Sequence, residues 1–187
     1  MKQGLSEHAS IGTFAKFSLQ LMSIGAPLWI LKLSNEASLD EIRHTQISFD
    51  IANMYNGVND QCIIYDEFPS HLVDIDGDWN EIARDTAIGG CIGETISAFK
   101  MIEKKYDNMI DRFIYDMAMD EIRHAALAWI TVKWIINNAT NDIVIEVANR
   151  NWWLKQMGNV GQDYVKVIDG ILNKIHSRKS GDNYQEL

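Results

Sequence analysis

The pentapeptide Asp-Glu-Ile-Arg-His occurs twice in this chain, at residues 40–44 and again at residues 120–124. Each copy contains a glutamate and a histidine three positions apart. On an α-helix such residues lie about one turn apart on the same face, so each pair could bind a metal ion. The duplication therefore predicts two helices that carry metal ligands at matching positions, and two metal ions between them.

A metal site inside a helical bundle also takes one carboxylate from each of the other two helices. Glu7 and Glu94 fit this role, because each begins a Glu-x-x-Ser segment that precedes one copy of the pentapeptide. The same order of segments in both halves indicates an internal repeat. The predicted metal ligands are Glu7, Glu41, His44, Glu94, Glu121 and His124.

Proline is rare in this chain, and apolar residues recur at the 3.6-residue period of a helix almost throughout. These features predict an all-α protein, a four-helix bundle. A crossover at about residues 58–78 lacks the helical period and separates the second helix from the third. Its acidic run at 74–78 lacks the glycine and glutamate of an EF-hand loop, so we interpret it as a helix N-cap. The four predicted helices span about residues 5–23, 27–56, 79–104 and 108–138.

Beyond the bundle, residues 142–179 are predicted to form two shorter helices, interrupted at 157–161. We expect these helices to pack on the end of the bundle. A chain of 187 residues is long enough for one hydrophobic core and short for two. We therefore predict a single domain over residues 1–187, with the bundle at about 5–137.

Composition and charge exclude several classes of function. The formal net charge of −9 disfavours nucleic-acid binding, because that affinity comes largely from clustered lysine and arginine. No apolar run is long enough to span a membrane, and the N-terminus has no apolar signal segment, so we expect a soluble cytoplasmic protein. Cys62 and Cys91 lack zinc-finger spacing, which excludes a zinc ribbon.

The predicted ligands could instead belong to solvent-exposed helix faces that carry salt bridges. For any single glutamate or histidine this simpler interpretation is the better one. The complete set argues against it, because both Glu-x-x-His pairs align with apolar residues at helical spacing, such as Ile114 and Ala118 for the second pair. Buried charges without partners are costly, and two metal ions would neutralise four carboxylates.

Small residues surround Glu94 on the third predicted helix, namely Gly89, Gly90, Cys91 and Gly93. A glycine inside a helix costs about 1 kcal/mol relative to alanine, so the run requires a compensating role. Close helix packing, a π-bulge and a substrate channel all fit this pattern. Cys91 could line such a channel or serve as a small buried hydrophobe.

The paired motifs resemble those of the ferritin-like di-iron carboxylate superfamily, over about residues 5–137. Within that superfamily, paired Asp-Glu-x-Arg-His motifs are more similar to the oxygen-activating oxygenases, desaturases and ribonucleotide reductase small subunits than to ferritins or rubrerythrins. Two features depart from the family pattern: the spacing between Glu94 and the second motif is short, and Glu7 lies close to the start of its helix.

The resemblance also implies a role for the two aspartates of the motifs. Asp40 would accept a hydrogen bond from His124, and Asp120 from His44, which fixes each ring and raises its basicity as a ligand. Alternatively, each aspartate simply pairs with the arginine three residues later in its own motif.

The resemblance and the ligand types imply two iron ions, with manganese or a mixed pair as alternatives. The implied function is a non-haem di-iron oxidoreductase that uses dioxygen to hydroxylate, desaturate or N-oxygenate a small organic or carrier-bound substrate. A non-catalytic iron-binding or ferroxidase and storage protein is the alternative, and a purely structural metal site is a third. The substrate, the electron donor and the oligomeric state stay open, with a homodimer as one option.

Overall fold

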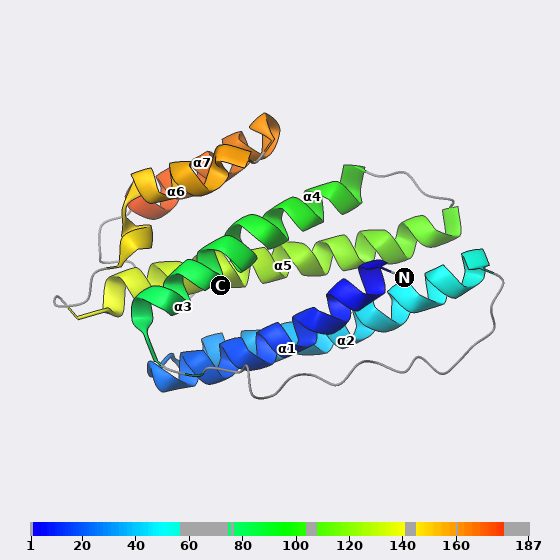
Figure 1. The fold of residues 1–187 in the computed structure, drawn as a ribbon, viewed down its shortest axis with the longest axis horizontal. Helices are drawn as coiled ribbons and strands as arrows, with labels where there is room; N and C mark the ends of the chain where they lie inside the picture. Colours follow the sequence, from blue (N-terminus) through cyan, green and yellow to red (C-terminus); the bar gives the residue numbers. More distant parts are fainter. Residues whose placement is uncertain are drawn as a thin grey trace.

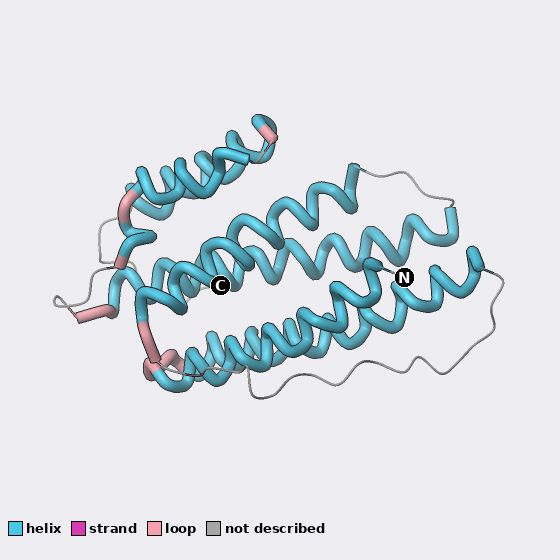
Figure 2. The backbone as a smooth tube through the Cα atoms, viewed as in Figure 1, coloured by secondary structure: helices cyan, strands magenta, loops and turns pink. Residues whose placement is uncertain are grey.

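The computed structural model describes residues 2–56, 75, 77–103, 108–140, 145–159 and 161–177. Within these ranges the regular structure is entirely helical, which confirms the all-α prediction (Figure 2). The predicted crossover at 58–78 lies largely outside the described residues. The elements of the main body are α1 (Lys2–Ser23), α2 (Leu28–Asn56), α3 (Trp79–Asp85), the π-helix η2 (Thr86–Glu94), α4 (Thr95–Glu103) and α5 (Asn108–Asn138).

These elements form four rods that lie side by side (Figure 1). α1 and α2 form a hairpin, while α3, η2 and α4 run end to end as one rod beside α5. α2 also contacts α5, which joins the two pairs of rods. The two pentapeptide motifs therefore lie on adjacent rods, although they are far apart in the sequence.

The turn between α1 and α2 is a Schellman motif. Gly25 has a φ of +70°, a conformation that favours glycine. The amide of Ala26 donates to the carbonyl of Leu21 at 2.9 Å, and the amide of Gly25 donates to that of Met22 at 3.1 Å. Pro27 follows directly, and α2 begins at the next residue. This short turn makes α1 and α2 neighbours.

The start of α3 confirms a helix N-cap at Asp78, the last residue of the acidic run. The carboxylate of Asp78 accepts hydrogen bonds from the amides of Asn80 at 2.8 Å and Glu81 at 3.1 Å. These bonds satisfy amides that have no partner within the helix itself.

The third predicted helix has its expected extent, but its middle is a π-helix rather than an α-helix. Gly90 explains how this wider segment packs against α5, because a Cβ atom at this position would lie 2.4 Å from the Cβ of Ala128. Close packing and a π-helical segment, two of the roles considered for the glycines, therefore occur together. Cys91 is fully buried in the hydrophobic core, so it serves as a small buried hydrophobe.

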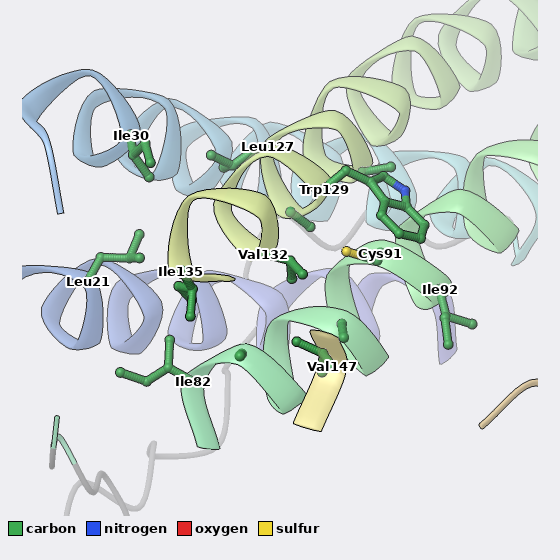
Figure 3. Close-up of a cluster of buried hydrophobic side chains, with 14 of the residues drawn as sticks. Leu21, Ile30, Ile82, Cys91, Ile92, Leu127, Trp129, Val132, Ile135 and Val147 are labelled. Carbon is green, nitrogen blue, oxygen red and sulfur yellow. The ribbon is translucent and has the colours of Figure 1, made fainter. Parts of the chain in front are cut away.

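The hydrophobic core fills the end of the bundle that contains the turn between α1 and α2 (Figure 3). Each of the four rods contributes to it. α5 runs through its centre, where Val132 and Ile135 are buried. The other rods contribute Leu21, Ile30, Ile82 and Cys91. This apolar end holds the rods together next to the polar site described below.

The C-terminal segment comprises η3 (Glu146–Ala148), α6 (Arg150–Gln156), η4 (Met157–Asn159) and α7 (Gln162–Ser177). The ring of Trp153 stacks on that of Trp129 with centroids 5.1 Å apart, and the Tyr164 hydroxyl donates to Glu103 at 3.0 Å. The two predicted helices are therefore present. They pack along the side of α4 and α5, so the expectation that they cover the end of the bundle was wrong, because Trp129 offers its stacking face partway along α5.

Among the described helices, none combines the length and the apolar character that crossing a membrane requires.

Replacing Gly90 with alanine should lower the free energy of unfolding by about 1–3 kcal/mol, the usual cost of overpacking, because the new Cβ collides with Ala128. The neighbouring change Gly89→Ala is the matched control, since its Cβ meets no atom within 4 Å. Urea unfolding of both variants measures the difference. Equal stabilities would contradict the close contact, and Ala128→Gly should rescue the first variant.

Candidate metal centre

The fold brings all six predicted ligands to one place between the rods. They form two overlapping groups whose ligand atoms lie within 4.8 Å of one another, and Glu121 belongs to both groups. Five of the six side chains are at most 5% exposed, and Glu94 is partly buried. The first group contains Glu7, Glu41, His44 and Glu121, and the second contains Glu94, Glu121 and His124.

The two motif glutamates lie between the two histidines. A Glu41 oxygen lies 3.8 Å from Nδ1 of His44, and its other oxygen lies 3.2 Å from Nδ1 of His124. Glu121 mirrors this arrangement, at 3.4 Å from His44 and 3.8 Å from His124. Each of these carboxylates therefore spans the space between the two histidines. Glu7, Glu41 and Glu94 each belong to one group, but of these three only Glu41 has ion-pair contacts with both histidines, so Glu7 and Glu94 are suited to end positions.

Both histidines direct the same ring nitrogen into the site. Nε2 of His44 lies 3.0 Å from a carboxylate oxygen of Asp120, and Nε2 of His124 lies 3.4 Å from one of Asp40. Among the described residues, Nδ1 of either histidine is a buried atom that makes no hydrogen bond. An aspartate at Nε2 favours a proton on that nitrogen, which leaves the Nδ1 lone pair available to a metal ion.

The aspartates also pair with the motif arginines, so the two roles considered for them coexist. Arg43 contacts Asp40 at 3.0 Å and also Asp120 on the neighbouring rod. Arg123 contacts Asp40 at 3.1 Å and the aspartate of its own motif. The four side chains form a ring of alternating charge that connects α2 to α5. Sequence spacing indicated only the pairs within each helix, because contacts between helices depend on how the rods are placed.

Burial and mutual repulsion raise the pKa of the two end glutamates. Burial, contact with Glu121 and the negative charge of Glu41 raise the pKa of Glu94 to about 11. Burial raises the pKa of Glu7 to about 7, although a hydrogen bond from Gln3 opposes the shift. In the metal-free protein Glu94 therefore keeps its proton at neutral pH.

The pKa values of His44 and Glu41 shift toward their charged forms. Burial alone would lower the pKa of His44, but the carboxylates of Glu121, Glu41 and Asp120 outweigh it and raise the pKa to about 10. Burial likewise opposes ionisation of Glu41, yet its contacts with the two histidines lower its pKa. Protons thus supply part of the positive charge that these carboxylates require, and bound metal cations would replace them.

Two residues beside the site were not found from the sequence. The Gln3 side chain donates to the carboxylate of Glu7, and the ring of Phe14 meets that of His124 edge-on at 5.0 Å. Gln3 lies four residues before Glu7, a spacing at which helical side chains meet, so this signal was available. Phe14 lies on a different rod from His124, and no sequence spacing indicates that contact.

A cavity of about 610 Å³ lies between α1, η2 and α5 and reaches Glu94 and His124. Its walls include Phe14, Ile88 and Leu127. Gly89 and Gly90 also line it, so the glycine-rich segment contributes to a cavity as well as to close packing. Cys91 is not among the lining residues, in agreement with its place in the core.

Comparison of the chain with protein-family models, with curated proteins and with solved structures gave no match.

The metal-free protein should lose stability as pH rises from about 6 to about 9. Glu7, Glu94 and His44 bind protons more tightly when folded than in the unfolded chain, where the pKa values are about 4.3 and about 6.5. The stabilisation that each group adds is fully present below its pKa in the unfolded chain. It is lost as the pH rises to about 7 for Glu7, about 11 for Glu94 and about 10 for His44. Urea unfolding at several pH values measures this loss.

Glu94→Gln is the control for this pH dependence, because glutamine mimics the protonated acid and does not titrate. The variant should lose stability less steeply with pH than the parent protein. An unchanged slope would show that Glu94 does not hold its proton in the folded state.

Asp120→Asn should weaken metal binding by roughly 10–100-fold, the usual effect of removing a carboxylate that orients a ligand histidine. The helical content should stay the same. A competition titration against a chelator, with circular dichroism on the same samples, measures both quantities. Asp116→Asn on the exposed face of α5 is the control. Equal metal affinities in the two variants would contradict the role of Asp120 in orienting His44.

Proposed function

We propose that this chain is a non-haem di-iron oxidoreductase that activates dioxygen to oxidise an organic substrate. One observation carries the proposal. Two buried histidines, held at Nε2 by aspartates of the opposite motif, direct unpartnered Nδ1 atoms toward two glutamates that lie between them. A buried arrangement of this kind is costly without cations, because the carboxylates repel one another.

The donor set supports iron or manganese as the bound metal. Four carboxylates and two imidazoles are hard and intermediate ligands, which suit these metals, and no thiolate takes part. The arrangement also fits the general pattern of di-iron and di-manganese bundles, in which two helices supply one glutamate each and two supply a Glu-x-x-His pair. We therefore propose a ferritin-like topology for the bundle.

The position of each side chain in the site suggests its role. Glu41 and Glu121, which lie near both histidines, would help to hold both metals, while Glu7 and Glu94 would each help to hold one. Asp40 and Asp120 would hold the imidazole rings in the orientation that binds metal. Two ferrous ions bound here would supply electrons and coordination positions for the reduction of dioxygen. Phe14, packed on His124, would keep water from one side of the site.

The cavity favours an oxidoreductase over an iron-storage protein. A storage protein must admit hydrated iron, and hydrated cations gain little from apolar walls such as Phe14 and Leu127. An organic substrate gains from the same walls through the hydrophobic effect. Gel filtration gives an independent check, because storage requires assembly into a large shell.

The central experiment loads the protein with ferrous iron without oxygen, counts the iron per chain, and follows the absorbance after mixing with oxygen. We expect two irons per chain and an absorption band that depends on oxygen. One metal or none, with no such band, would contradict the proposal.

Glu121→Ala should remove most of the bound iron and all of the oxygen-dependent absorbance, because Glu121 belongs to both groups of ligands. The matched control is Glu36→Ala, which removes an exposed glutamate paired with Lys32 on the surface of α2. Iron analysis and stopped-flow absorbance on both variants provide the comparison. Full iron content in Glu121→Ala would reject the assignment of this residue as a ligand shared by the two groups.

A further inference from the structure

The cavity between α1, η2 and α5 reaches Glu94 and His124, two candidate ligands of the same group. A molecule in the cavity would therefore lie beside one of the two metal positions. Its volume of about 610 Å³ falls within the roughly 300–1,000 Å³ that small-molecule sites occupy. The cavity is thus large enough for an organic substrate and is placed where such a substrate could react.

The walls of the cavity are suited to an apolar molecule. Phe14 and Phe17 line it from α1, Ile88 from η2, and Leu127 from α5. Gln20, which is buried, adds a polar group. A mostly apolar cavity with a few polar groups is the usual composition of a site that binds an organic ligand.

Lys16 adds a positive charge to this apolar setting. Among the described residues that line the cavity, it is the only lysine or arginine. Its side chain is half-buried and makes no ion pair with any described acid, including Asp85 on the other wall. Asp85 is exposed, so water screens its charge, whereas Lys16 is more buried than Asp85. An anionic group on a bound ligand would form a charge-assisted hydrogen bond with the Lys16 ammonium.

We propose that this cavity binds an organic acid, with its apolar body against Phe14 and Leu127 and its acid group on Lys16. The inference rests on the proposed function, because it names the substrate class of the same site. With the acid group on Lys16, the apolar carbons of the ligand are the part that extends toward Glu94 and His124.

Three probes of equal chain length test the proposal by isothermal titration calorimetry: octanoate, 1-octanol and octylamine. The full chain is used, with and without ferrous iron and under anaerobic conditions. Octanoate should bind about tenfold more tightly than octanol, in line with the gain from a charge-assisted hydrogen bond, and octylamine should bind most weakly. Octyl phosphate as a fourth probe distinguishes a carboxylate from a phosphate head group. Tighter binding of either acid than of octanol agrees with the proposal.

Two pairs of variants locate the binding site. Lys16→Gln should remove the preference for octanoate and leave octanol binding unchanged, while Lys32→Gln on the exposed surface of α2 should change neither. Gly89→Leu should weaken the binding of all probes, because Gly89 lines the cavity. Gly170→Leu on α7 is its control, since both glycines face open space.

If the affinity for octanoate is unchanged by Lys16→Gln or by Gly89→Leu, the proposal is overturned. The iron count on the same samples separates this failure from failure of the proposed function. Two bound irons without octanoate binding would reject the substrate class alone. Octanoate binding by a protein that binds no iron would reject the proposed metal centre. The cavity would then be a ligand-binding site without the proposed oxidation reaction.

Discussion

Negative charge is concentrated inside the bundle, and the neighbouring side chains are arranged around it. Four glutamates approach one another among the rods, and burial strengthens their repulsion because little water screens it. In the metal-free protein, raised pKa values at Glu94 and His44 keep protons in the site. The ring of Asp40, Asp120, Arg43 and Arg123 connects α2 to α5 beside this charge and orients both histidines. The same concentration of negative charge makes the site a strong candidate for binding cations.

The π-helix η2 connects the metal centre to the cavity. It ends at Glu94, so the wider helical turn sets where this glutamate enters the site. Gly90 allows η2 to approach Ala128 closely, and Gly89 and Gly90 leave space for the cavity on the side of α1. The other side of η2 is tightly packed, because Cys91 lies in the core and the indole of Trp129 donates to Thr95 at 3.5 Å. The π-helix η2 thus packs against the core on one side and lines the cavity on the other.

The helices and the candidate ligands could be predicted from the sequence because both depend on short-range patterns. The positions of Glu41 and His44 follow from spacing within one helix, and the turn at Gly25 and Pro27 follows from the backbone preferences of these residues. The π-helix could be considered but not assigned, because its hydrogen bonds shift the register without a unique sequence signal. The position of α6 and α7 was predicted wrongly, because the stacking of Trp153 on Trp129 joins residues from separate parts of the chain.

Local periodicity and motif spacing are enough to predict the all-helical class, the approximate helix ends and the six side chains that could bind metal. Three further features could be read only from the folded chain: which nitrogen of each histidine enters the site, which arginines pair with which aspartates, and where a cavity reaches Glu94 and His124. The physical reason is that these features depend on the rotation and separation of neighbouring rods. Packing of distant side chains such as Gly90 and Ala128 sets those quantities.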